Sequence, residues 1–238
     1  MSLFLLSLTV IIPIPFCLLR MKKYDISLLK TIIIYVSFSA VGAIGACIGA
    51  YMSGEPIYSV RLYGLIIFDS VLLLLLSRIM KIDIGTMGDF ISVPIMVTCF
   101  SSKINCYIQG CCTGFYICET QSGEIVRFPS ALFEMMLWAF LIVLLSVLEK
   151  SGDSKNILWP IAVVWFGILR FIASCFRKYE RPLIENILNI SAGKVWSLVT
   201  SIIGLIYLYY LLRREVNRQP KLYEFLQAIV GTQISTDN

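Results

Sequence analysis

The amino-acid sequence predicts an all-α protein: a polytopic transmembrane helical bundle of about seven spans, with the N-terminus outside and the C-terminus inside. Three observations predict this fold class. Hydrophobic residues make up 58% of the 238 residues and charged residues only 15%, whereas soluble domains are about 45–50% apolar and about 25% charged. The apolar residues fall in successive runs long enough to cross a bilayer as helices. Basic residues follow several of these runs.

The first apolar run covers residues 3–19, and Arg20, Lys22 and Lys23 follow it. A secretory signal peptide carries its positive charge before the apolar run rather than after it. We therefore interpret residues 3–19 as a true membrane span that starts outside and ends inside.

The second and third spans are expected at residues 31–51 and 62–77. The second span contains Gly42, Gly45 and Gly49. Small residues at such spacing let helices approach one another closely in lipid. The three glycines therefore predict a helix-packing face.

The fourth span is expected at residues 89–100, which is a short segment that contains Pro94. Segments of this kind are often kinked or partly re-entrant. Residues 101–129 follow as the longest polar stretch of the chain, and we expect them to form a loop on the outer side.

The remaining three spans are expected at residues 130–148, 157–176 and 195–212. Seven spans with short loops use most of the chain and leave little for a soluble domain. We therefore expect residues 1–218 to form a single transmembrane domain and residues 219–238 to form a polar cytoplasmic tail.

The basic residues orient the predicted bundle, because Lys and Arg gather at the cytoplasmic ends of spans. With the N-terminus outside, the inner ends hold the larger basic set: Arg20, Lys22, Lys23, Lys30, Arg78, Lys81, Lys150, Lys155, Arg213, Arg214 and Arg218. The outer side holds a smaller set: Arg61, Lys103, Arg127, Arg177, Lys178, Arg181 and Lys194. An anionic ligand on the outer face would explain this second set. No basic block with interleaved aromatics is present, so we expect no nucleic-acid partner.

Three ionisable residues fall inside the expected spans: Asp69, Glu134 and Arg170. A charged residue at the centre of a span costs roughly 2.5–3.5 kcal/mol and usually faces the protein interior. Two interpretations are open: a structural Arg–carboxylate pair that joins two helices, or a polar site for a lipid headgroup. The chain contains no histidine, so any chemistry must use other side chains.

Four cysteines lie close together in the polar stretch: Cys106, Cys111, Cys112 and Cys118. Their spacing leaves several interpretations open. They can pack around a tight glycine turn, form disulfides on an outward face, or bind zinc. A nucleophilic cysteine activated by Lys103 is a further alternative.

Four segments carry a family resemblance. Residues 102–114, SKINCYIQGCCTG, are similar to the motif G-R-I-G-N-F-x-N-G-E-x-x-G, and closer to the form G-R-x-G-C-F-x-x-G-C-C-Y-G. Residues 127–134, RFPSALFE, are similar to R/H-P-S-Q-L-Y-E. Residues 166–171, FGILRF, with Arg177 are similar to Y-G-x-x-R-F-x-x-E-x-x-R, and residues 191–198, SAGKVWSL, to S-x-G-Q-x-x-S-L. In this order the motifs resemble those of the bacterial prolipoprotein diacylglyceryl transferases, in a divergent branch with a G-C-C-x-G motif.

The resemblance implies a transferase that moves a diacylglyceryl group from phosphatidylglycerol to the lipobox cysteine thiol of a preprolipoprotein, with glycerol phosphate leaving. It implies an enzyme of lipoprotein biosynthesis in the bacterial cytoplasmic (inner) membrane, crossing it several times with the active face toward the outer leaflet. The expected partners are the phospholipid, the preprolipoprotein and the membrane. No cofactor and no metal ion are expected.

The same resemblance assigns roles to individual residues. Arg170 would bind the phosphate with help from Lys103, because cationic side chains suit phosphate oxygens. Glu134 would orient one of the basic residues, and the Tyr63 phenol would hydrogen-bond the headgroup. These four are the expected catalytic residues. The expected substrate-binding residues are Asn105, Arg127, Arg177, Gly110 and Gly114.

The chain departs from the family pattern at four positions. Lys103 stands where the family has its signature Arg, and Tyr63 stands where it has the His of an H-G-G-L motif. Ser174 replaces an acidic residue of the family pattern, and Lys194 replaces a Gln. Lysine keeps the charge but loses the bidentate fork of arginine. Two alternatives therefore stay open: a non-catalytic phospholipid-binding membrane protein, or a transferase with a different lipid or acceptor. An unrelated transporter whose broken fourth span lines a substrate path is a third.

Overall fold

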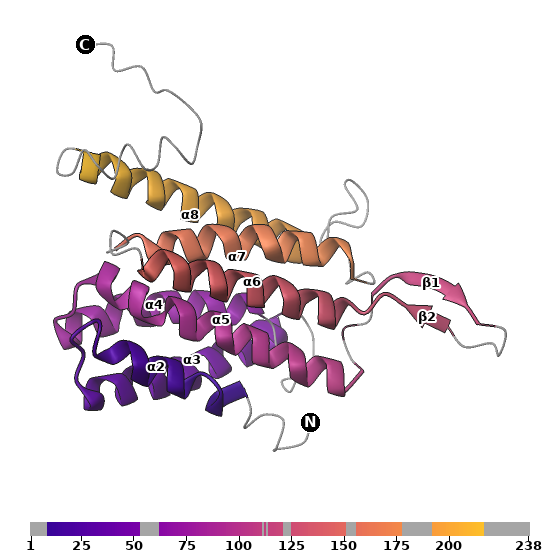
Figure 1. The fold of residues 1–238 in the computed structure, drawn as a ribbon, viewed down its shortest axis with the longest axis horizontal. Helices are drawn as coiled ribbons and strands as arrows, with labels where there is room; N and C mark the ends of the chain where they lie inside the picture. The colour runs from indigo at the N-terminus through magenta and orange to yellow at the C-terminus, as the bar shows by residue number, and fades with distance from the viewer. Residues whose placement is uncertain are drawn as a thin grey trace, which may run out of the picture.

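The computed structural model describes most of the chain. The described residues are 9–52, 62–110, 112, 114–120, 125–150, 156–177 and 192–216. Within them the chain forms a bundle of roughly parallel helices from which a two-stranded hairpin projects at one end (Figure 1). The expected cytoplasmic tail, 219–238, lies outside the described residues.

Helices form almost all of the described structure. They are α2 (Ile14–Met21), α3 (Leu28–Met52), α4 (Leu62–Met80), α5 (Ile84–Ile108), α6 (Ser130–Lys150), α7 (Leu158–Cys175) and α8 (Ala192–Val216). Within the described residues, five helices are long and apolar enough to cross a membrane: α3, α5, α6, α7 and the Gly193–Leu211 part of α8. The chain is therefore a helical membrane protein, as the composition predicts.

Each predicted span from the second to the seventh overlaps one helix, in order from α3 to α8. The first predicted span is described only in part. Thr9–Met21 is a shorter apolar helix, and residues 3–8 of that span lie outside the described part of the chain. The number of spans and the orientation of the termini stay predictions.

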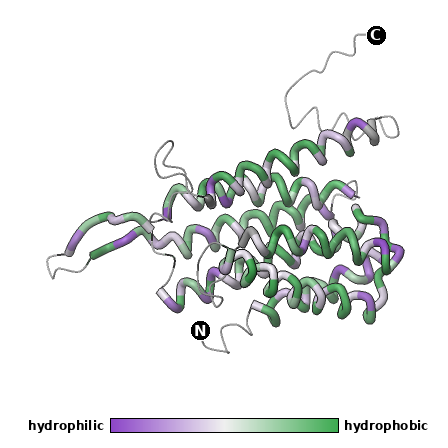
Figure 2. The backbone as a smooth tube through the Cα atoms, turned by 180° about the vertical axis from the view of Figure 1, so that it is seen from behind, coloured by the Kyte–Doolittle hydropathy of each residue, from purple (hydrophilic) through white to green (hydrophobic). Residues whose placement is uncertain are grey.

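Two clusters of apolar side chains, each packed between helices, form the core. One lies between α5, α6 and α7, where the rings of Trp138 and Phe166 stack with their centroids 5.1 Å apart. The other lies between α2, α3, α4 and α5 around Phe90 and Met87, both fully buried. Hydrophobic positions run along the helices and hydrophilic ones gather towards the helix ends, while the hairpin carries both kinds (Figure 2). This distribution fits a bundle whose sides face lipid.

The backbones of α3 and α4 are in direct contact. A Cβ atom added to Gly64 would lie 1.9 Å from the carbonyl oxygen of Gly45, and one added to Gly45 would lie 2.7 Å from the Phe68 Cβ. Without glycine at these positions the helices would have to move apart. The predicted packing role of Gly45 is therefore confirmed.

The predicted fourth span was wrong in its bounds. Instead of ending at residue 100, α5 runs as one helix from Ile84 to Ile108 with Pro94 inside it. Asp83 starts the helix earlier than expected, because its carboxylate accepts hydrogen bonds from the backbone N–H groups of Gly85 and Thr86. The helix also continues through the polar residues after Phe100. This is possible because α5 is the most buried of the five candidate spans, so that its polar side chains have partners inside the protein.

The predicted outer loop at 101–129 is also corrected. Its first residues belong to α5, and the rest includes two short strands, β1 (Tyr116–Glu119) and β2 (Ile125–Arg127). The strands pair antiparallel, with Tyr116 opposite Arg127 and an irregularity before Cys118. Their side chains are mostly exposed, so no alternation of buried and exposed residues marked the hairpin in the sequence.

A buried ion pair joins α2, α5 and α6 at the end of the bundle away from the hairpin. Arg20, only 7% exposed, pairs with Glu149. Its Nη2 donates to the Asp89 carbonyl at 2.6 Å and its Nε donates to the Phe90 carbonyl at 3.1 Å. The Asp89 carboxylate accepts from the Trp159 backbone N–H at 2.8 Å. The sequence placed Arg20 at a span end but did not predict its partners.

Candidate functional site

Glu134 is the centre of a buried cluster of charges near the hairpin end of the bundle. It lies in the second turn of α6 and is 0% exposed. Lys103 Nζ and Arg170 Nη1 each lie 3.0 Å from Glu134 Oε2. Arg177 Nε lies 2.5 Å from Glu134 Oε1. One carboxylate therefore holds three cationic groups from three parts of the chain.

The cluster carries more positive than negative charge. Its three cationic side chains are 13%, 8% and 10% exposed for Lys103, Arg170 and Arg177, and Glu134 neutralises only one of them. Buried charges outside water are costly unless they are paired. The Nε atom of Arg170 is buried and has no hydrogen-bond partner among the described residues. The cluster is therefore suited to accept an anionic group.

The ends of three helices bring these residues together. Lys103 is there because α5 continues past residue 100. Glu134 is placed by the start of α6, where Ser130 donates its backbone N–H to the Phe128 carbonyl at 2.8 Å. Arg170 projects from the last turns of α7, and Arg177 follows that helix directly. The structure thus collects four residues that are up to 74 positions apart, from Lys103 to Arg177.

Arg177 is held by a backbone contact with the loop before the hairpin. Gly114 and Arg177 form an isolated antiparallel bridge. A Cβ atom at Gly114 would lie 2.4 Å from the Phe128 carbonyl oxygen, so only glycine fits here. The Phe128 ring packs against Phe176 with centroids 5.2 Å apart. This packing fixes the backbone that carries Arg177.

The remaining predicted site residues are less directly involved. Asn105 is buried, and its Oδ1 accepts from Gln109 Nε2 at 2.7 Å. Gly110 has a φ of +64° at the end of α5. Arg127 lies half-buried on β2 and does not reach Glu134. The side chain of Tyr63 lies outside the described residues, as do Arg61, Lys178 and Arg181.

Of the two carboxylates expected inside the spans, only Glu134 pairs with Arg170. Asp69 faces α3, where a Cβ atom at Gly42 would lie 3.0 Å from its Oδ2. Its Oδ1 is buried without a hydrogen-bond partner in the described part of the chain. The Arg–carboxylate pair expected from the sequence is therefore present between α6 and α7.

Cys112 is a functional candidate whose protonation state the sequence did not reveal. A side-chain hydrogen bond with Cys106 and the charges of Lys103 and Arg177 together lower the pKa of the Cys112 thiol to about 5, against the opposing effects of burial and of the Glu134 charge. This lowered pKa favours the thiolate form of Cys112, whose charge offsets part of the positive charge of the cluster. The sequence shows Lys103 nine positions before Cys112, but this spacing alone does not show that the lysine charge acts on the thiol.

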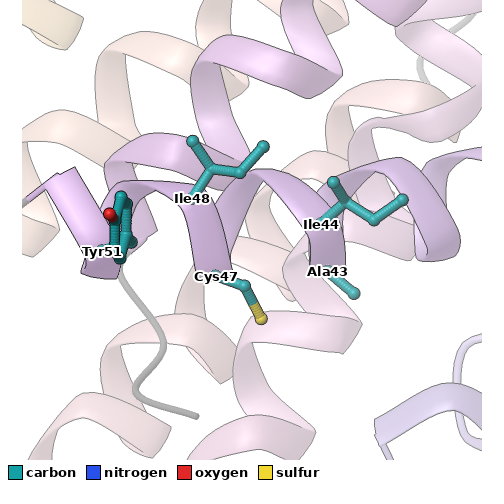
Figure 3. Close-up of a pocket in the computed structure, with 5 residues that line it drawn as sticks. All are labelled: Ala43, Ile44, Cys47, Ile48 and Tyr51. Atoms are coloured by element: carbon teal, nitrogen blue, oxygen red, sulfur yellow. The ribbon is translucent and has the colours of Figure 1, made fainter. Parts of the chain in front are cut away.

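An apolar pocket on α3 is separate from the charged cluster. Its lining consists of Ala43, Ile44, Cys47, Ile48 and Tyr51, all from that one helix (Figure 3). No residue of the Glu134 cluster lines it. The pocket carries no charged group and does not contribute to the candidate site.

Comparison with known proteins gives two matches. A family model described as prolipoprotein diacylglyceryl transferase matches residues 5–210, which include the whole Glu134 cluster. A protein of Acidiphilium cryptum (strain JF-5), named phosphatidylglycerol–prolipoprotein diacylglyceryl transferase, is 22% identical over 212 residues. That alignment covers 76% of this chain and 77% of the relative.

Proposed function

Because this chain belongs to the prolipoprotein diacylglyceryl transferase family, we propose that it moves a diacylglyceryl group from phosphatidylglycerol to the lipobox cysteine thiol of a preprolipoprotein. The relative from Acidiphilium cryptum carries the name of this activity. The observation that carries the proposal is the buried Glu134 carboxylate with three cations around it. The surplus of positive charge suits the phosphate of one phospholipid headgroup.

The reaction gives each member of the cluster a role. The acceptor sulfur forms a bond to the terminal glycerol carbon of the diacylglyceryl group, and the bond from that carbon to the phosphate oxygen breaks. Negative charge then increases on the departing glycerol phosphate. Arg170 and Lys103 stabilise this charge in a site with little water, where electrostatic stabilisation is strongest. Arg177 helps to bind the headgroup, and Glu134 positions all three cations.

The acceptor thiol has to lose its proton to a group other than Glu134, because three cations already surround that carboxylate. Tyr63 is the candidate that the family pattern suggests, and its phenol would also hydrogen-bond the headgroup. Asn105 and Arg127 are proposed to line the mouth of the site. Gly110 and Gly114 allow the loop backbone to turn and pack closely there.

The proposed placement in the membrane follows from the charges. With about seven spans and the N-terminus outside, the ends of α5, α6 and α7 that form the cluster lie on the outer side of a bacterial cytoplasmic membrane. The opposite ends, near Glu149, lie inside. The cluster then takes its phospholipid from the outer leaflet, where a translocated preprolipoprotein presents its cysteine.

The direct test is transfer by the purified full chain in detergent. A peptide with a lipobox cysteine is incubated with phosphatidylglycerol, and mass spectrometry detects the diacylglyceryl thioether on that cysteine. Thioether formation that depends on both substrates is expected. Saturable binding of phosphatidylglycerol without transfer would instead support a non-catalytic phospholipid-binding protein. Transfer from another lipid, or to another thiol, would support a relative with changed substrates.

A further inference from the structure

The β1–β2 hairpin exposes apolar side chains where it leaves the end of the bundle (Figure 1). Tyr116 and Ile117 of β1 are 54% and 49% exposed, and Val126 of β2 is 37% exposed. Tyr116 lies opposite Arg127 in the ladder. Val126 precedes Arg127, so its side chain points to the other face of the hairpin. Both faces therefore carry apolar side chains that the described part of the protein leaves uncovered.

The base of the hairpin is fixed to the bundle. The Gly114 N–H donates to the Phe128 carbonyl at 3.0 Å, and the Phe128 N–H donates to the Phe115 carbonyl at 2.9 Å. The Phe115 and Phe128 rings stack with their centroids 5.2 Å apart. Phe133 of α6 and Phe176 after α7 both pack against the Phe128 ring. The hairpin base is therefore held at a fixed depth relative to α6 and α7.

The length of α6 places this base at the boundary of the hydrocarbon core. The 21 residues of the helix rise about 30 Å, and the core of a bilayer is also about 30 Å thick. Exposed apolar side chains on α6, from Met136 to Val147, mark the surface that faces lipid. β2 ends at Arg127, three residues before α6 begins at Ser130. The strands therefore begin where the core ends and the headgroup layer begins.

Lipid headgroups fit this surface better than a protein partner does. A peptide that docks on a hairpin adds to one edge or covers one face, which would leave the apolar side chains of the other face in water. A headgroup layer surrounds the hairpin on all sides. Tyrosine favours this layer because its ring is apolar and its hydroxyl polar. Tyr107 and Ile108, at the same end of the bundle on α5, are exposed as well.

We propose that the base of the β1–β2 hairpin is an interfacial membrane anchor, embedded in the headgroup layer at its end of the bundle. This layer is about 5–7 Å thick, and a strand rises about 3.3 Å per residue. It therefore holds about two residues of each strand, which are Tyr116 and Ile117 on β1 and Val126 and Arg127 on β2. Glu119, at the far end of β1, reaches water.

Tryptophan fluorescence of the full chain in phosphatidylcholine nanodiscs tests this depth. Ile117→Trp and Val126→Trp each add an indole at the hairpin base, and the wild-type signal of four tryptophans is subtracted. A nitroxide on the lipid headgroup should quench both added indoles several-fold more than the indole of the matched control, Glu119→Trp. Iodide in the water should quench in the reverse order. Met136→Trp, exposed on α6, reports quenching by lipid within the core when the nitroxide is on the acyl chain.

Three results would overturn the proposal. Equal quenching at positions 117 and 119 by either reagent would mean that the hairpin base is no deeper than its tip. Protection of position 117 or position 126 from both reagents would mean that protein, such as a second copy of the chain, covers the hairpin. Headgroup quenching at only one of these two positions would mean that lipid contacts a single face. The test uses neither phosphatidylglycerol nor an acceptor peptide, so its failure leaves the proposed transfer untouched.

Discussion

At the scale of single residues, the Glu134 cluster consists of one anionic side chain and three cationic ones. Glu134 touches Lys103, Arg170 and Arg177, so each cation is stabilised by a partner that the others share. Removing Glu134 would leave three buried positive charges together. Removing one cation leaves Glu134 still paired with two. The cations can therefore be tested for function with less disturbance of the fold than the carboxylate.

Arg170→Ala is expected to reduce transfer to a small fraction of the wild-type rate and to leave the protein folded. Glu134 keeps Lys103 and Arg177, whereas the departing phosphate loses a buried donor. Loss of one such donor typically costs about 100- to 1000-fold in kcat. Thioether formation measures activity, and thermal unfolding in the same detergent measures folding. Arg78→Ala, which removes an exposed arginine of α4, is the matched control and should be fully active. Full activity of Arg170→Ala would contradict the assigned site.

The reaction of Cys112 with iodoacetamide is expected to depend on pH in a way that differs from an ordinary thiol. Cys106, Lys103 and Arg177 lower its pKa to about 5, and Glu134 acts in the opposite direction. The thiolate therefore persists as pH falls from 8 and is lost only near pH 5, whereas N-acetylcysteine loses it near about pH 8.5. Site-resolved mass spectrometry gives the midpoint. A Cys112 midpoint at that of N-acetylcysteine would contradict this assignment.

At the scale of secondary-structure elements, the sequence predicted where helices lie better than where they end. Runs of apolar residues located α3, α4, α6, α7 and α8, because lipid demands a long apolar helix at each crossing. The extension of α5 was missed, since hydropathy treats the polar residues after Phe100 as loop. Lys103 is compatible with a helix only because Glu134 meets it from α6. Such a partner, 31 positions away in the sequence, leaves no local signal.

Gly64→Val is expected to destabilise the contact between α3 and α4. The new side chain would overlap the Gly45 carbonyl, 1.9 Å from the added Cβ. Overpacking of this kind typically costs about 1–3 kcal/mol. A lower unfolding temperature in detergent is the expected readout. Ile67→Val, at an exposed position of the same helix, should unfold near the wild-type temperature. Equal stability of the two variants would show that the helices separate without cost.

At the scale of the whole molecule, two buried ionic clusters lie near opposite ends of the bundle. Glu134 anchors one and Arg20 with Glu149 forms the other. The first cluster brings together four of the expected site residues, Lys103, Glu134, Arg170 and Arg177, and their roles stay predictions. The second cluster was not predicted, because nothing in the sequence distinguishes Arg20 from the other basic residues that follow a span. Its burial depends on carbonyls of α5, about 70 positions away.

Arg20→Met is expected to reduce the free energy of unfolding by about 3–5 kcal/mol, because it leaves Glu149 buried without its closest partner. The double variant Arg20→Met/Glu149→Leu should regain most of that stability, since no unpaired charge remains. Thermal unfolding of the wild type, both single variants and the double variant gives the coupling between the two side chains. Additive losses would mean that the pair is not coupled. The KM for phosphatidylglycerol should stay unchanged in the double variant.

The continuous α5 helix has a consequence for the surrounding bilayer. Asp89 lies at one polar cluster and Lys103 at the other, and the 14 helical steps from one to the other span about 21 Å. A hydrocarbon core is about 30 Å thick. A helix of fixed length thus holds both sets of charges closer together than the two headgroup layers normally lie. A phospholipid headgroup that reaches Arg170 must therefore lie deeper than its neighbours in the same leaflet, so the thickness of the host membrane becomes part of the energy needed for that headgroup to bind.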